Sequence, residues 1–379
     1  MLNIDQPRAL EEPQGELGHI IHAAIQKAGG WIGFDAFMPL ALYTPGLGYY
    51  ASGSAKFGLL PGRGGAGSPG SDFATAPEMT PLFGRALAVQ VAEALQRTGT
   101  SEVWEFGGGS GALALHLLQA LDTQAVPWSR YTIVEVSASL RARQQALLAG
   151  YGSKVRWVDA LPAQMQGVVI GNEVLDAMPV KLLARAQGRW RERGVASDPQ
   201  GSFEWQDRDT ALQPPLQPPG AHDYLTEIHP QAEAFIRTLA DRLVAGAAFF
   251  IDYGFPEHEY YHPERSMGTL MCHRAHRADA DPLQDVGQKD ITAHVNFTGI
   301  ALAAQDAGLE VLGYCSQARF LMNCGLLTGL ESASWADKAM AQKLILEHEM
   351  GELFKVIGLC RGDAWQALGF AQGDRTHTL

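Results

Sequence analysis

The sequence WEFGGGSGALALHLLQAL at residues 104–121 decides the fold. A short apolar run ends at Phe106, glycines follow at positions 107, 109 and 111, and an apolar pattern typical of a helix begins at Ala112. Glycines between a strand and a helix let the backbone approach a nucleotide-like ligand closely, because they carry no Cβ atom. This stretch therefore predicts a strand, a ligand-binding turn and a helix.

The chain around this turn alternates strand and helix patterns. Strand patterns occur at SEVWEF (101–106), RYTIVEV (130–136), KVRWVDA (154–160), GVVIGNE (167–173) and AAFFIDYG (247–254). Helix patterns, ALALHLLQAL and ASLRARQQALLAG, follow the first two. Such alternation is typical of an α/β protein whose parallel sheet has helices on both faces.

We divide the chain into three parts. Residues 1–100 are expected to form a helical segment that contributes to the ligand site. This segment includes a Gly-rich loop at 59–73, and the pattern at 77–96 predicts one amphipathic helix. Residues 101–330 are expected to form the core, with insertions near 181–220, where an antiparallel hairpin is predicted, and near 254–300. LEVLGYCSQARFL (309–321) predicts a strand pair. WADKAMAQKLILEHEMGELFKVIG (335–358) predicts a helix in a C-terminal helical segment, 331–379.

The composition indicates a globular protein rather than a nucleic-acid-binding or membrane-spanning one. The formal net charge is -12 over 379 residues, which argues against a general basic surface for nucleic acid. The four cysteines show no regular spacing and are expected to be reduced thiols. Because the polar N-terminus lacks a secretory pattern and no run approaches ~20 apolar residues, we expect a cytoplasmic protein.

The glycine turn admits two cofactors. Gly107-x-Gly109-x-x-Ala112 fits a relaxed dinucleotide fingerprint, and Glu135 ends the next strand where an NAD-binding acid is expected. S-adenosylmethionine (SAM) is favoured by Glu105, because a carboxylate there suits an ammonium group and would repel a pyrophosphate. An NAD-dependent oxidoreductase therefore remains an alternative.

Acids at later strand ends also favour SAM. Asp159 ends the third strand, where it can accept a hydrogen bond from an adenine amino group, and GNEVLDAMP places polar side chains after the fourth strand. The carboxyl edge of an open α/β sheet is where such proteins bind ligands. The competing interpretation is that Glu105 and Asp159 only cap the turns that follow them.

Several motifs together resemble a known family. They are SDFATAPEMTPLFG (71–84), EFGGGSG (105–111), YTIVEVSASLRARQ (131–144), GNEVLDAMPV (171–180), FFIDYGFPEHEYYHPERSMGTLMCHRAHRADADPL (249–283) and DITAHVNFT (290–298). In these motifs the chain resembles the MidA-type class I SAM-dependent methyltransferases, a family that includes a mitochondrial methyltransferase assisting assembly of respiratory complex I. Ser71 and Asn296 depart from the family pattern, which often has Gly and Asp there.

The resemblance implies a fold, a cofactor and roles for individual residues. The fold is a Rossmann-like seven-stranded sheet with helices on both faces, an N-terminal helical segment and insertions. Cofactor contacts would come from Glu105, Gly107, Gly109 and Gly111 (methionyl end), Glu135 (ribose), Asp159 (adenine), Asn172, and Asp72, Thr75 and Glu78 of the SDFATAPE segment. Thr75, or Ala76, ahead of Pro77 and Glu78 can equally be a capped helix start.

The resemblance also implies methylation of arginine in a protein partner, of the complex I subunit type. A guanidinium is cationic and a poor nucleophile, so carboxylates that fix it and localise its charge would help. Glu173, Asp176 and Asp252 are the candidate clamp, with Asn172 as an orienting residue and His294 as a proton acceptor or orienter. Alternatively, Asp176 caps a turn before Pro179, and His294 is structural. A SAM-binding assembly factor with little catalysis is a further alternative.

The histidine-rich insertion does not predict a metal site. His258 and His262, and His273 and His276, have ligand-like spacing, but Pro263 disfavours a helix and no cysteine lies at ligand spacing. We expect no metal. One hypothesis is that aromatic and basic residues of this insertion form the wall of a peptide-binding cleft, and that this insertion and the 185–205 hairpin determine specificity.

Overall fold

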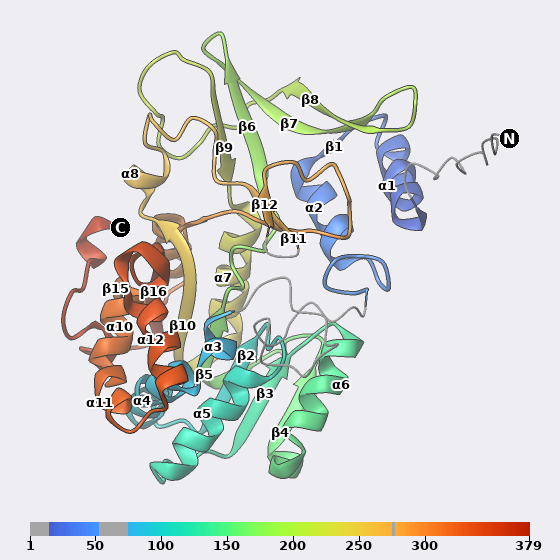
Figure 1. Cartoon of the computed structure of the whole chain (residues 1–379). Coiled ribbons are helices and arrows are strands. Elements are labelled where there is room, and N and C mark those ends of the chain that lie inside the picture. Colours follow the sequence, from blue (N-terminus) through green and yellow to red (C-terminus); the bar gives the residue numbers. More distant parts are fainter. Residues whose placement is uncertain (1–14, 53–74, 275–276) are drawn as a thin grey trace, which may run out of the picture.

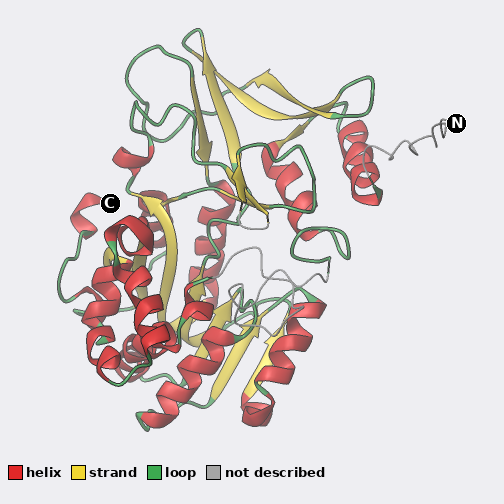
Figure 2. Ribbon diagram, viewed as in Figure 1, coloured by secondary structure: helices red, strands yellow, loops and turns green. Residues whose placement is uncertain are grey.

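The computed structural model describes residues 15–52, 75–274 and 277–379. Figure 1 and Figure 2 show a large α/β unit with a smaller antiparallel sheet above it. The strands of the main sheet have the order β15-β16-β10-β5-β2-β3-β4. They are β2 (Glu102–Phe106), β3 (Arg130–Val134), β4 (Val155–Val158), β5 (Met165–Asn172), β10 (Leu243–Phe255), β15 (Glu310–Ser316) and β16 (Phe354–Arg361). Of these seven, β16 runs antiparallel to the other six.

Helices cover both faces of this sheet because its strands are apolar on both sides. Phe249 and Phe250, adjacent on β10, belong to different cores, since successive side chains of a strand point to opposite faces. One core includes residues of α4 (Pro81–Thr98), α5 (Ala112–Thr123), α10 (Gln317–Asn323), α11 (Leu326–Glu331) and α12 (Trp335–Ile345). The other includes residues of α7 (Pro230–Arg242) and α9 (Phe297–Asp306). With α6 (Ala138–Leu147) after β3, this is the predicted class I methyltransferase fold.

The N-terminal segment packs on the first insertion. The second sheet has the order β1-β7-β6-β9, with β8 on the other side of β7. Its strands are β1 (Ile32–Gly33), β6 (Lys181–Ala186), β7 (Arg189–Ser197), β8 (Phe203–Asp209) and β9 (Tyr224–Ile228). A core that joins Leu17, Phe37 and Leu182 links it to α1 (Glu16–Lys27) and α2 (Phe34–Tyr43). The antiparallel strands predicted after the fourth core strand are therefore present, and they are part of a larger sheet.

The second insertion contains short elements. These are α8 (Glu257–Tyr260), β11 (Met271–Arg274), β12 (Arg277–Asp279), β13 (Asp290–Thr292) and β14 (Val295–Asn296). Strands β12, β11 and β13 form a three-stranded sheet, and β14 pairs with the end of β10. This insertion thus lies beside the end of a core strand.

The C-terminal prediction was partly wrong. The helix predicted over 335–358 ends at Ile345, and Phe354–Arg361 is instead strand β16, buried between β10 and β15. Helical spacing of Leu346, Met350 and Leu353 concealed a strand that is buried on both faces, because such a strand shows no alternation. Residues 331–379 are therefore not a purely helical segment. Similarly, 309–321 is one strand, β15, followed by α10 rather than a strand pair.

The amphipathic pattern at 77–96 is divided between two helices. Thr80 separates α3 (Ala76–Met79) from α4, and its hydroxyl accepts a hydrogen bond from the N–H of Leu82. Thr80 is thus the N-cap of α4, with Pro81 at its first position. The predicted Gly-rich loop at 59–73 lies outside the described residues. In the described part of the chain, every helix is too short or too polar to cross a membrane.

Candidate functional site

The glycine turn lies at the carboxyl edge of the sheet, beside a cavity of about 970 Å³. Gly107, Gly109 and Gly111 have φ of +64°, +50° and +89°, a region that other residues rarely adopt. Gly107 and Gly109 line the cavity. Gly111 is not among the described lining residues; a Cβ there would lie 3.3 Å from side-chain atoms of Gln144 and Leu147 on α6. Gly111 therefore packs against α6 in this structure, and its cofactor contact stays a prediction.

Glu105 is a buried acid at the base of the cavity. Only 1% of its surface is exposed, and the Tyr131 hydroxyl donates a hydrogen bond to its Oε2 at 2.9 Å. Burial raises the pKa of Glu105 to about 8. A cationic ligand group beside it would restore the ionised form.

Glu135 lies at the end of β3 and is held in place by its neighbours. Its Oε1 accepts the N–H of Ser137 at 2.8 Å, and its Oε2 accepts the Gln144 side-chain amide at 3.0 Å. The same amide nitrogen donates to the carbonyl of Gly109 at 2.9 Å, so one side chain joins this acid to the glycine turn. Asp159, in contrast, is exposed beyond β4 and is not among the described residues that line the cavity.

Three polar residues at the end of β5 and just after it, Asn172, Glu173 and Asp176, line the same cavity. Glu173 has φ of +54°, with its N–H bonded to the carbonyl of Ile251, and the Asn172 amide donates to its Oε1 at 2.9 Å. Asp176, 4% exposed, accepts the Tyr253 hydroxyl at Oδ2. Within the described part of the chain, the buried Oδ1 of Asp176 and Oδ1 of Asn172 have no hydrogen-bond partner. Two buried acceptors without donors indicate a site for a ligand that donates hydrogen bonds.

The pKa values of these acids are raised. Burial, and then the charge of Asp176, raise the pKa of Glu173 to about 8. Burial raises the pKa of Asp176 to about 6, although the Tyr253 hydroxyl favours its ionised form. Perturbed acids in one cavity are typical of functional sites.

Asp252 has a different position from the one predicted. Its Oδ2 accepts the backbone N–H groups of Val174, Leu175 and Asp176 at 3.1, 2.9 and 3.2 Å, and it is not among the described lining residues. Because these amides satisfy its carboxylate, the prediction that Asp252 belongs to the clamp is corrected. Asp252 holds the loop that carries Asp176.

His294 lines the cavity but is packed between aromatic rings. Its ring stacks on the ring of Phe255, with centroids 5.2 Å apart, and makes a T-shaped contact with the ring of Tyr253, with centroids 5.1 Å apart. Burial, and then the Arg265 guanidinium, lower the pKa of His294 to about 4. The ring is therefore neutral at pH 7 and a weak base.

The SDFATAPE segment reaches the cavity from the N-terminal side. Thr75 and Glu78 line it, while Ser71 and Asp72 lie outside the described residues. Thr75 is also the N-cap position of α3, so both predicted interpretations are compatible with its place, although its side chain makes no capping hydrogen bond.

Several polar lining residues were not predicted from the sequence, among them Tyr43, Tyr50, Tyr253 and Asp290. Tyr253 follows Asp252 at a strand end, which was a usable signal. The others come from a Pro-rich stretch and from the second insertion, and nothing local places them together.

The cavity is acidic. Its described lining includes Glu78, Glu105, Glu135, Glu173, Asp176 and Asp290, and no lysine or arginine. SAM carries an ammonium and a sulfonium, which suit such a lining, whereas a pyrophosphate would be repelled. The site therefore fits SAM and does not fit a dinucleotide.

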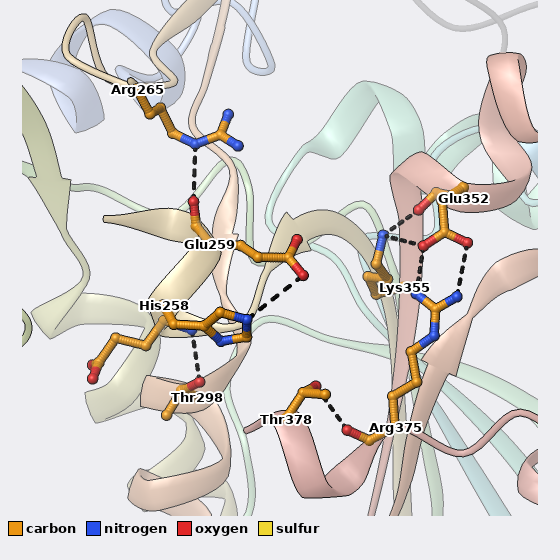
Figure 3. Close-up of polar contacts among 9 residues, drawn as sticks. His258, Glu259, Arg265, Thr298, Glu352, Lys355, Arg375 and Thr378 are labelled. Atoms are coloured by element: carbon orange, nitrogen blue, oxygen red, sulfur yellow. Dashed lines mark hydrogen bonds and ion pairs between the residues drawn. The ribbon is translucent and has the colours of Figure 1, made fainter. Parts of the chain in front are cut away.

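The histidines with ligand-like spacing, His258, His262, His273 and His276, belong to the second insertion. Within the described ranges, no three His, Cys, Asp or Glu side chains are arranged to hold a metal ion, and His276 lies outside those ranges. Figure 3 shows His258 beside Glu259, with Nε2 of His258 3.9 Å from Oε1 of Glu259, and nearby Glu352 paired with Lys355 and Arg375. The polar side chains here form ion pairs, of which His258–Glu259 is exposed and Lys355–Glu352 has a buried lysine.

Comparison with known proteins decides the family. A model described as "Putative S-adenosyl-L-methionine-dependent methyltransferase" matches residues 86–315, more than half of the chain. This chain belongs to that family. A Burkholderia thailandensis protein crystallised with S-adenosyl-homocysteine is 47% identical with a TM-score of 0.89, covering 98% of this chain and 100% of that one.

Curated relatives are more distant. The protein arginine methyltransferase NDUFAF7, mitochondrial, of Danio rerio is 27% identical over 85% of this chain and 80% of that protein. The Homo sapiens protein of the same name is 27% identical over 79% and 71%. The family and the bound structure show a SAM-dependent methyltransferase, and S-adenosylmethionine is its cofactor. The NAD-dependent alternative was wrong.

Proposed function

We propose that this methyltransferase methylates arginine in a protein partner, and that Glu173 and Asp176 bind the guanidinium. The observation that carries the proposal is the buried Oδ1 of Asp176, which has no hydrogen-bond donor in the described part of the chain. Glu173 lies beside it, and no lysine or arginine is among the described lining residues. A buried carboxylate oxygen of this kind costs free energy unless a cation satisfies it.

The residues divide the work between cofactor and acceptor. Glu105, Glu135 and the glycine turn would hold SAM, with Thr75 and Glu78 over it, and SAM supplies the methyl group. Asn172 Oδ1 and the two acids would accept N–H bonds from the guanidinium and fix one nitrogen for transfer. That nitrogen loses a proton as it gains the methyl group, and Glu173, with a pKa near 8, is suited to accept it.

The distant relatives support the protein partner. Those proteins are named as protein arginine methyltransferases, and a subunit of respiratory complex I is the partner that the family resemblance implies. Location stays a prediction: the sequence favoured the cytoplasm, whereas the names of these relatives include "mitochondrial".

The test uses tritiated SAM and a lysate of cells that lack this gene. We expect labelled protein whose acid hydrolysate contains methylarginine, and no label with Glu173→Gln although that variant still binds S-adenosyl-homocysteine. Glu264→Gln, on the exposed surface of the second insertion, is the matched control. Label in another residue would overturn the proposal, and absence of label from a wild-type protein that binds the cofactor would favour an assembly factor.

A further inference from the structure

A second tyrosine–aspartate pair lies in the cavity, apart from Asp176 and Tyr253. The Tyr50 hydroxyl donates a hydrogen bond to Oδ1 of Asp290 at 2.7 Å, and both residues line the cavity. Asp290 is 3% exposed and begins β13, whereas Tyr50 follows α2. The pair therefore joins the N-terminal segment to the second insertion.

This pair lies at the acceptor end of the cavity. Burial is the main cause that raises the pKa values of Glu173 and Tyr43, and the charges of Asp176 and Asp290 raise both further. The ring of Tyr43 stacks on Tyr50 with centroids 5.5 Å apart. Asp290 is therefore close to the acids that we assign to the acceptor.

Backbone contacts hold Asp290 in this place. Strand β13 pairs with β11, with Asp290 opposite His273. Three residues later, the N–H of Ala293 donates to the carbonyl of Asp176 at 3.0 Å. The Tyr43 hydroxyl donates to the carbonyl of Ala177 at 3.0 Å, so both contributing segments are anchored on the same loop.

We propose that Asp290 is a third carboxylate of the acceptor site, positioned by Tyr50, and that it makes the site select a guanidinium over an ammonium. This inference rests on the proposed function and adds the residue that determines specificity. A guanidinium is planar and offers five N–H donors in a fork, so it can bind carboxylates on several sides at once. An ammonium is a compact point charge with three donors and gains less from a third, separately placed acid.

The test measures binding of two small probes in the presence of saturating S-adenosyl-homocysteine. Nα-acetyl-arginine methylamide and Nα-acetyl-lysine methylamide are titrated into wild-type protein, Asp290→Asn, Tyr50→Phe and Glu264→Gln, and dissociation constants are read from NMR shifts. Affinity of each variant for S-adenosyl-homocysteine is measured separately, and unchanged values show that the cofactor site is folded.

Wild-type protein should bind the arginine probe more tightly than the lysine probe. Asp290→Asn should lower the affinity for the arginine probe by about tenfold, because a charge-assisted hydrogen bond is lost, and should change the affinity for the lysine probe little. Tyr50→Phe should lower the affinity for the arginine probe by roughly threefold, and Glu264→Gln should bind both probes with the affinity of the wild-type protein. If wild-type protein shows no preference for the arginine probe, the proposed function fails. If it does and Asp290→Asn keeps the full preference, only the role of Asp290 is overturned.

Discussion

The hydroxyl of Tyr253 donates a hydrogen bond to the carboxylate of Asp176, which leaves the other oxygen of Asp176 for a ligand. The two residues are brought together because β5 and β10 are neighbours in the sheet and end at the same edge. Asp252, next to Tyr253, binds the amides of the loop that carries Asp176. The end of β10 therefore holds the loop 173–176 in two ways. Asp252 binds the backbone of this loop, and Tyr253 binds the carboxylate of Asp176.

Tyr253→Phe should lower kcat/KM for methyl transfer by roughly 10- to 100-fold, because losing a hydrogen bond to a charged group usually costs a free energy that corresponds to this factor. Because the hydroxyl favours ionised Asp176, its removal should raise the pKa of Asp176 and move the acidic limb of the pH profile to higher pH. Tyr151→Phe, whose hydroxyl lies outside the described lining of the cavity, is the control. An unchanged pH profile in Tyr253→Phe would contradict this assignment.

Activity of the wild-type protein should rise between about pH 6 and 8, because the pKa values of Asp176 and Glu173 are near 6 and 8 and their ionised forms bind a cation. A pH–rate profile at saturating SAM measures this. An essential acid that ionises near pH 4 instead would rule out Glu173 as the titrating group.

Glu173→Gln should stabilise the ligand-free protein at pH 8 and have little effect at pH 5. In the unfolded chain Glu173 ionises near its ordinary pKa, whereas in the folded protein it holds its proton to about pH 8, so its contribution to stability falls as pH rises through this window. The expected gain is ~1–3 kcal/mol at pH 8 by urea unfolding. Glu264→Gln should show no such pH-dependent difference, and equal stability of Glu173→Gln and wild type at both pH values would contradict the raised pKa.

Binding of S-adenosyl-homocysteine at pH 7 should release up to about one proton, because Glu105 is mostly protonated in the free protein and a ligand ammonium favours its ionised form. Calorimetric titrations in buffers of different ionisation enthalpy measure this number. Glu105→Gln should remove the proton release and weaken binding. Glu102→Gln, on the same strand and paired at the surface with Arg130, should keep both.

Gly107→Ala and Gly99→Ala form a matched pair, since both glycines have φ of +64°. Each substitution should destabilise the fold by ~1–2 kcal/mol through backbone strain. Only Gly107→Ala should also weaken S-adenosyl-homocysteine binding. Gly107 lines the cavity and a Cβ there would lie 3.1 Å from Val174, whereas a Cβ at Gly99 would point into open space. Equal cofactor affinity in the two variants would show that the turn does not approach the ligand.

The sequence by itself determined the core strands β2 to β5 and β10, the glycine turn, and the placing of Glu105, Glu135 and Glu173 at strand ends. Each of these depends on local pattern, because a strand followed by a turn and a helix fixes the direction of residues a few positions apart. The cofactor could be inferred for the same reason. The final strand could not, since β16 is buried on both faces and lacks alternation.

Only the tertiary structure decided which acids share the cavity and what each one contacts. Asp159 and Asp252 are also strand-end acids, yet the first is exposed and the second binds backbone amides. Tyr50 and Asp290 are 240 positions apart and meet because the N-terminal segment and the second insertion pack on one loop. Such contacts follow from packing between distant segments, so no short stretch of sequence encodes them.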